Sequence, residues 1–259
     1  MYEALHIAAT GLRNQQRRLD SIANNIANSN TVGYKAERLD FKTALYTAGI
    51  VPGPPYSPDA NQQKGHGVMV TAVARDFFTG NMQTTENELD FAIEGKGFFE
   101  IEDASGNITY TRAGNFYVST LSDGTKALVT GSGSFVRDAD GQRITVPDGT
   151  TGFSASLDGE LSFLDGTGSP PSVKLGIFTF TNETGLSSEG SAKFSETEVS
   201  GTKTTEGAGS LRQGTLEQSN VQLANEMQRM IRAQRAFSLS ARALTTADDM
   251  EGIANAMRK

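Results

Sequence analysis

The chain has 259 residues, of which 37% are hydrophobic, so it can bury one sizeable core or two modest ones. It carries 23 basic and 30 acidic residues, a formal net charge of −7, and no basic stripe, which argues against a nucleic-acid-binding protein. Cysteine is absent, which excludes disulfides, thiolate chemistry and cysteine-ligated zinc. No apolar run reaches the roughly 18 residues of a membrane helix, and we expect no cleaved signal peptide.

The N-terminal region predicts a helix with a narrow apolar seam. Apolar or small residues recur there at intervals of three and four, the spacing of a heptad pattern. The series comprises Leu5, Ala8, Leu12, Leu19, Ile22 and Ile26, and only Gln15 interrupts it. The end of this helix carries Asn24, Asn25 and Asn28, where helix propensity alone would favour Glu or Lys. Something other than propensity therefore selects these amides.

The next segment, residues 48–66, reads AGIVPGPPYSPDANQQKGH, with four prolines and no hydrophobic period. This composition predicts an extended loop or arm. We expect a neighbouring subunit to order it, so that it acts as a spacer and brace.

Residues 67–214 predict an all-β domain. Short alternating or aromatic runs are separated by turn residues that include Asp123-Gly124, Asp140-Gly141 and Asp158-Gly159. The expected strands are FAIEG, GFFEIED, NITYTR, NFYVST, KALVTG, RITVPDG, FSASLDGELSF and KLGIFTFTNE.

The last forty residues repeat the helical pattern of the N-terminus. Leu223, Met230, Phe237 and Leu244 are seven residues apart, and Met227 and Ala241 occupy intermediate positions around Gln234. Each terminal helix should span ~25 to 35 residues. Two arrangements fit the pattern: a two-helix hairpin within one chain, or packing against helices of other copies.

The search for catalytic or metal-binding residues gives almost nothing. His6 and His66 have no partner at metal-ligand spacing. DADG, residues 138–141, lacks two acids of a calcium loop because Val136 and Pro147 stand in their places, which favours a hairpin turn. GKG, residues 95–97, lacks the rest of a phosphate loop and is typical of a sharp turn between strands. We expect no enzyme activity, no metal and no cofactor.

Five blocks in order resemble the axial proteins of the bacterial flagellum, which build the basal-body rod and the hook. The blocks are SIANNIANSNTVGYKAERLDF, LDFAIEGKGFFEI, YTRAGNF, GTLEQSNVQLANEM and MIRAQRAFSLSARALTTADDM. The resemblance is greatest to rod proteins, and among these to the distal rod type, because the chain is short and has an insertion after the first helix region. A proximal rod subunit and a non-flagellar envelope adaptor remain alternatives. A glycan-active envelope enzyme is a third, although no pair of acids stands out for it.

The resemblance implies an α+β fold, with a mainly β central domain carried on terminal helices that pair as a coiled coil in the assembled filament. The expected segments are 1–47 and 215–259 in an inner tube, 48–66 as the arm, and 67–214 as an outer layer. The implied function is a structural drive shaft that polymerises helically and transmits torque to the hook. The implied partners are copies of itself, other rod proteins, the hook protein, the export apparatus and surrounding bushing rings. The implied location is the basal body outside the inner membrane, reached by export without signal cleavage.

The residues expected to form subunit contacts lie on the two terminal helices. They are Leu5, Leu12, Leu19, Ile22, Asn24, Asn25, Ile26, Asn28, Leu223, Met227, Met230, Phe237 and Leu244. Carboxamides can donate and accept hydrogen bonds without bringing charge into a packed wall, which would explain the asparagines. The alternative is that they face solvent or cap the helix end.

Overall fold

The structure is a computed structural model that describes residues 2–44, 46–48, 63–65, 67–121, 123–165 and 171–257. Contacts divide the chain into two compact units. The helical unit comprises Met1–Ala27, Glu37–Arg75 and Gln222–Lys259, and the β unit comprises Asn28–Ala36 and Asp76–Val221. The chain therefore passes between the units four times. The four segments expected from the sequence stay a prediction about the assembled protein.

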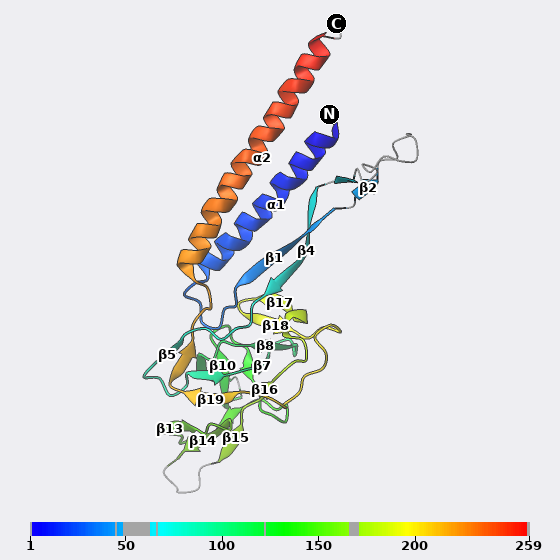
Figure 1. Ribbon diagram of the computed structural model, residues 1–259. Helices are drawn as coiled ribbons and strands as arrows, with labels where there is room; N and C mark the ends of the chain where they lie inside the picture. The colour runs from blue at the N-terminus through cyan, green and yellow to red at the C-terminus, as the bar shows by residue number, and fades with distance from the viewer. Residues whose placement is uncertain are drawn as a thin grey trace. The chain divides into compact units, whose positions relative to one another are not determined.

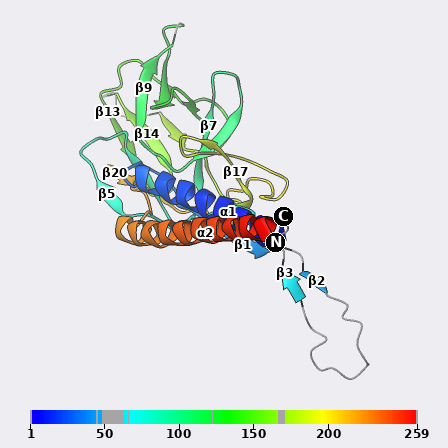
Figure 2. The same ribbon diagram turned by 90° about the horizontal axis from the view of Figure 1, so that it is seen from above.

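The helical unit contains two long helices that pack along one another (Figure 1). Helix α1 is Tyr2–Ala27, with 26 residues, and helix α2 is Leu223–Met257, with 35 residues. These lengths agree with the expected ones. The helices are antiparallel, so that both chain ends lie at the same end of the pair (Figure 2). Because α2 is longer, its last turns extend past the first residue of α1 (Figure 1).

The seam predicted on α1 is present. Its members are buried or half-buried, and they include the interrupting Gln15. Ile22 is the most buried of the apolar members, at 4% exposure. A helix of this kind gains most of its stability from packing along the seam rather than from propensity.

The stripe on α2 follows a register different from the predicted one. Met230, Phe237 and Leu244 lie half-buried on it, as expected. The intermediate positions, however, are filled by Glu226 and by the small residues Ala233, Ser240 and Ala247, and the predicted Ala241 is half-buried beside Ser240. The prediction of Met227 at an intermediate position was therefore wrong by one residue, and Met227 is 50% exposed. Small residues let two helices approach closely, but hydrophobicity alone does not single them out.

A two-stranded antiparallel ribbon completes the helical unit. Strand β1 (Glu37–Thr43) pairs with β4 (Val68–Arg75), and the register shifts by one residue between Asp40 and Phe41. A second antiparallel pair, β2 (Tyr46–Ala48) with β3 (Gln63–Gly65), lies between β1 and β4 in the sequence. These strands include the two ends of the arm predicted at 48–66. The rest of that arm, residues 49–62 and 66, lies outside the described residues.

The β unit is built from short strands, most of them antiparallel neighbours (Figure 1). Its largest sheet has nine strands, with β12-β10-β11-β7-β8-β18-β17 in order and β16 and β9 added at β7 and β10. Their bounds are β7 Phe98–Glu102, β8 Ile108–Thr111, β9 Phe116–Thr120, β10 Lys126–Thr130, β11 Phe135–Val136, β12 Thr145–Val146, β16 Ile177–Phe178, β17 Ser187–Gly190 and β18 Lys193–Ser195.

Three smaller sheets belong to the same unit. One contains β13 (Gly152–Ala155), β14 (Glu160–Leu164) and β15 (Ser172–Lys174). The other two join strands from opposite ends of the unit's sequence: β19 (Ser210–Gln213) pairs with β6 (Phe91–Glu94), and β20 (Thr215–Glu217) pairs with β5 (Met82–Thr84). A single 3₁₀ turn spans Glu183–Gly185. The eight runs predicted from the sequence all contain strands, which confirms the mainly β central region.

Two apolar clusters form the core of the β unit. The larger includes Phe91, Phe99, Phe116 and Phe163, all at most 1% exposed. The smaller is aromatic, and in it Phe98 lies edge-on to Phe194 and Phe180. Burying a side chain of this size contributes roughly 1.5–3 kcal/mol, so these phenylalanines account for much of the stability of the unit.

The predicted turns are also present. Gly124, Gly141 and Gly159 have φ of 79°, 79° and 87°, as tight turns after aspartate require. DADG closes a hairpin in which the Gly141 amide donates to the Asp138 carbonyl, as predicted. GKG connects β6 to β7 with φ of 113° at Gly95 and 133° at Gly97, values that favour glycine.

Candidate functional site

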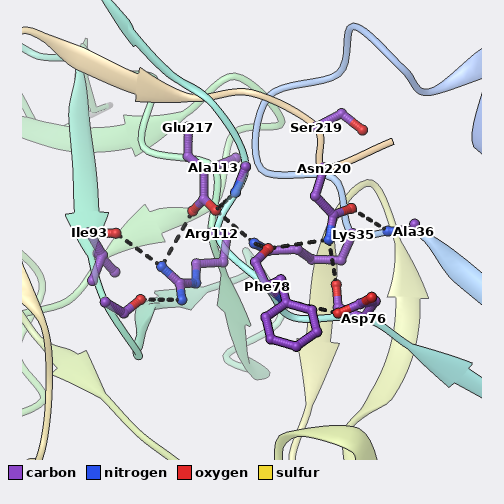
Figure 3. Close-up of polar contacts among 12 residues, drawn as sticks. Lys35, Ala36, Asp76, Phe78, Ile93, Arg112, Ala113, Glu217, Ser219 and Asn220 are labelled. Carbon is purple, nitrogen blue, oxygen red and sulfur yellow. Dashed lines mark hydrogen bonds and ion pairs between the residues drawn. The ribbon is translucent and has the colours of Figure 1, made fainter. Parts of the chain in front are cut away.

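The most unusual site in the β unit is a fully buried group of three charged side chains, Lys35, Arg112 and Glu217, hereafter the ion cluster (Figure 3). The carboxylate of Glu217 lies at its centre. Its Oε1 accepts hydrogen bonds from Lys35 Nζ at 2.7 Å and from the Gly80 amide at 2.8 Å. Its Oε2 accepts one from Arg112 Nη1 at 3.3 Å. One acid is therefore shared by two bases.

Backbone carbonyls satisfy the two bases further. Lys35 Nζ also donates to the Phe78 carbonyl at 2.8 Å. Arg112 donates from Nη1 to the Ile93 carbonyl at 3.2 Å and from Nη2 to the Gly95 carbonyl at 2.6 Å. Burial lowers the pKa of the Lys35 amine, while the Glu217 carboxylate opposes that shift. Burial likewise lowers the pKa of Arg112, again opposed by Glu217. Removing the shared acid would therefore leave two desolvated cations.

Backbone contacts around the ion cluster join segments that are far apart in the sequence. The Gly33 amide donates to the Glu217 carbonyl at 2.8 Å. The carboxamide of Asn220 accepts from the Ala36 amide at 2.8 Å and donates to the Asp76 carbonyl at 2.7 Å (Figure 3). The chain segments that enter and leave the β unit are thus bound to one another.

Two glycines permit this close packing. Gly33 has φ of 68°, and a Cβ added there would lie 2.5 Å from the Ala113 amide nitrogen. A Cβ on Gly80 would lie 1.9 Å from the Gln218 carbonyl oxygen. Both contacts are with backbone, so a side chain cannot be accommodated by a rotamer change. These glycines are required by the geometry of the site.

The ion cluster has no features of a catalytic site. Lys35 and Glu217 are completely buried, and Arg112 is 2% exposed, so no substrate reaches the charged atoms. Within the described residues, no group of three or more His, Asp or Glu side chains could hold a metal ion. His6 lies exposed on α1, and His66 lies outside the described residues. The arrangement is that of a structural clamp.

In the helical unit, Asn25 makes a second polar contact of structural importance. Its side chain is 1% exposed. The carboxamide donates to the Glu37 carbonyl and accepts from the Glu37 amide, both at 2.9 Å. It therefore pairs with β1 as a neighbouring strand would, and holds the start of the ribbon on α1. A contact within the chain therefore explains why asparagine stands at position 25.

Replacing Asn25 with alanine should destabilise the helical unit by about 1–3 kcal/mol, because the Glu37 amide and carbonyl would both lose a buried partner. The effect should be visible as faster amide hydrogen exchange in α1 and β1. Gln16→Ala is a control that also replaces an amide, since Gln16 is exposed on the same helix. Equal exchange in the two variants would contradict the role assigned to Asn25.

The other residues predicted for subunit contacts fall into three groups. Leu5, Leu12, Leu19, Ile22, Ile26, Met230, Phe237 and Leu244 lie in the packed stripes of α1 and α2. Leu223 and Met227, at 43% and 50% exposure, and Asn24 lie at the surface. Asn28 belongs to the β unit and is half-buried, and its side-chain oxygen accepts from the Thr31 hydroxyl. Their roles between subunits stay predictions.

The ion cluster was not predicted from the sequence, although part of a signal was present. Each of its residues lies inside one of the five quoted blocks, in NTVGYKAER, YTRAGNF and GTLEQSN. In the last two stretches a single charged residue stands among apolar, polar and turn residues, which makes it a candidate for burial with a partner. The local pattern, however, does not say which acid meets which base.

No helix among the described residues is both long and apolar enough to cross a membrane.

Comparison with known proteins identifies the family of this chain. Three family models match: "Flagella basal body rod protein" over residues 5–35, "Flagellar hook protein FlgE/F/G D1 domain" over 92–163, and "Flagellar basal body rod FlgEFG protein C-terminal" over 212–257. The flagellar basal-body rod protein FlgG of Borreliella burgdorferi is 38% identical over the full length of both chains. This chain belongs to the flagellar basal-body rod protein family.

Two further relatives from one bacterium bear on the subtype within the rod protein family. FlgG of Bacillus subtilis is 37% identical, over 96% of this chain and 97% of the relative. The flagellar hook-basal body complex protein FlhP of the same bacterium is 29% identical over both full lengths. The likeness to FlgG proteins is therefore greater than that to FlhP. The matched blocks of the rod protein family contain all three residues of the ion cluster.

Proposed function

We propose that the protein is a structural subunit of the flagellar basal-body rod, of the distal type, and that it has no catalytic function. The observation that carries this proposal is the match at 38% identity along the whole of a FlgG rod protein. The helical unit would build the inner tube by packing against other copies, and the β unit would form the outer layer. The polymer would transmit motor torque to the hook.

The ion cluster supports a mechanical role. A drive shaft needs rigid connections where segments of a subunit meet, and buried ion pairs with fixed hydrogen bonds oppose sliding of one segment past another. Here one acid fixes the segments around Lys35, Gly80 and Arg112 at once. We propose that the clamp keeps the β unit undeformed under load.

The partners follow from the same proposal. They are copies of the chain, other rod proteins and the hook protein, with the export apparatus as a transient partner and bushing rings as surrounding ones. The location would be the basal body outside the inner membrane, reached without signal cleavage. The arm at 48–66 would brace a neighbouring copy.

A deletion of the gene in its own organism tests the proposal. Cells should lose motility and regain it on complementation, and electron microscopy should show basal bodies with shortened rods. The length of the remaining rod separates the subtypes: loss of a distal subunit leaves the proximal part in place, whereas loss of a proximal one, the alternative subtype, leaves none. Complete rods in motile deletion cells would contradict a rod function.

A further inference from the structure

Charge is segregated along α2. All four of its arginines lie between residues 229 and 242, where no acid occurs, and the acids Asp248, Asp249 and Glu251 follow in a stretch that holds no base up to residue 257. Glu226, near the start of the helix, is paired with Arg229 at 2.7 Å. Arg258 and Lys259 follow in the sequence and lie outside the described residues. The first half of α2 is therefore basic, and the part that extends along and past the start of α1 is acidic.

Arginines of α1 add to the basic half. The helices are antiparallel, and Arg18 and Ile22 of α1 line one small pocket together with Glu226 and Arg229 of α2. Counted along both helices from that level, Arg13 and Arg17 come close to the level of Arg232 and Arg235. All four side chains are exposed, and in the part of the chain that the structure describes no ion pair involves them. We call these four residues the basic belt. The exposed carboxylates of Asp248 and Asp249 form the acidic tip, and they too lack an ion pair there.

Apolar side chains are exposed beside both charged surfaces. Near the belt, Leu223, Met227 and Ile231 are 43%, 50% and 52% exposed, and at the tip Met250, Ile253 and Met257 are 59%, 60% and 79% exposed. Exposed apolar groups of this size on one helix mark an interaction surface rather than a solvated face. The two surfaces are thus alike in apolar character and opposite in charge.

Belt and tip of one copy cannot meet. Arg232 and Asp248 are 16 residues apart on one helix, which at a rise of 1.5 Å per residue separates them by about 24 Å. Two copies that lie parallel and shifted along the helix axis can meet, because the tip of one then reaches the belt of the next. Such a contact is heterologous, and it repeats without closing, as a filament requires.

We propose that copies of this chain associate head to tail through α2, with the acidic tip of one copy against the basic belt of the next. This inference rests on the proposed function as a self-polymerising subunit. It sets the direction of addition, because tip–tip and belt–belt contacts bring like charges together. It also gives the axial shift between contacting copies as about 24 Å.

Charge reversal tests the proposal with purified full-length chains, by sedimentation and electron microscopy at low salt. Reversing all four arginines of the belt (Arg13→Glu, Arg17→Glu, Arg232→Glu and Arg235→Glu) makes the belt acidic, and Asp248→Arg with Asp249→Arg makes the tip basic. Each variant alone should need a concentration at least about tenfold higher than wild type to polymerise. A mixture of the two should copolymerise, because each tip then finds a belt of opposite charge. The variant that carries both sets of changes should polymerise alone like wild type.

The outcomes are separable. Failure of the wild type to polymerise at any concentration would overturn the proposed function together with the inference. Polymerisation of the wild type, the belt variant and the tip variant at equal concentration would overturn the inference alone, and so would a mixture that polymerises no better than either variant by itself. Glu189→Arg with Glu206→Arg, two exposed positions of the β unit, changes the net charge as tip reversal does and should polymerise like wild type. The belt variant and the tip variant should also keep the helix content of wild type, measured by circular dichroism.

Discussion

Replacing Glu217 with glutamine is expected to lower the melting temperature of the β unit by about 6–20 °C. Glutamine has the same shape but no charge, so Lys35 and Arg112 would stay buried without an anion. Breaking a buried ion pair at one partner costs about 3–5 kcal/mol, and each kcal/mol lowers the melting temperature by about 2–4 °C for a unit of this size. Calorimetry of the purified variant beside wild type measures the change.

A surface pair supplies the control. Glu94 and Arg212 form an ion pair at 3.4 Å, but the two side chains are 57% and 54% exposed. Glu94→Gln should therefore change the stability by less than about 0.5 kcal/mol. If the Glu217→Gln and Glu94→Gln variants have the same melting temperature, the ion cluster contributes no more to stability than a surface pair.

The loss of stability caused by Glu217→Gln should depend on pH. Burial lowers the pKa of Lys35 in the folded chain, and without Glu217 nothing opposes that shift as strongly. Between the lowered value and the ordinary value of about 10.4, the unfolded chain then binds more protons than the folded one, so stability rises with pH. The Glu217→Gln variant should accordingly recover part of its stability relative to wild type as the pH rises from 7 toward 10. If the stability difference between the variant and wild type instead grows from pH 7 to 10, the loss does not come from the buried Lys35 amine.

Replacing Phe237 with alanine should abolish polymerisation and motility while leaving the β unit intact. Phe237 lies half-buried on the stripe of α2 within the helical unit. In a packed helical wall its truncation costs about 3–5 kcal/mol through lost burial and a cavity. Phe237 belongs to the helical unit and not to the β unit, so the melting of the β unit should stay within about 0.5 kcal/mol of wild type.

Two measurements decide this prediction. Calorimetry reports the β unit, and circular dichroism reports the helix content of the dilute monomer. We expect the terminal helices to be loosely ordered before assembly, because one narrow seam offsets little of the ordering cost of about 1–2 kcal/mol per residue. Gln234→Ala, on the exposed side of α2, is the control. A large drop in the melting of the β unit with Phe237→Ala would mean that the two units fold as one.

Sequence periodicity predicted the elements that depend on local pattern. Both helices and many strands of the β unit were found, because apolar spacing and Asp-Gly turns are read within a few residues. Strands outside the eight predicted runs, β5, β11 and β17 to β20, were missed. The register of α2 was missed by one residue because Ala233 and Ser240 are too small to stand out. Strand β1, ERLDFKT, was missed because it is charged and largely exposed, and its burial alternates only over the first four residues.

The ion cluster lies beyond what local pattern can give. Lys35 and Glu217 are 182 residues apart, and nothing near either residue identifies the other. The same holds for β19 with β6 and β20 with β5. Pairings of this kind depend on the topology of the whole unit, whereas a helix or a hairpin depends on its own residues.

These long-range pairings also determine when the β unit can be completed. Strands β5 and β6 find their partners only in the last strands of the unit, so a growing chain lacks them until residue 217 has been added. Until then Lys35 and Arg112 stay in water, where their charge costs nothing, and the loop to be closed is long. Folding dominated by distant contacts is slow. A newly made chain therefore has an interval in which its β unit is still incomplete, and closure around Glu217 ends that interval.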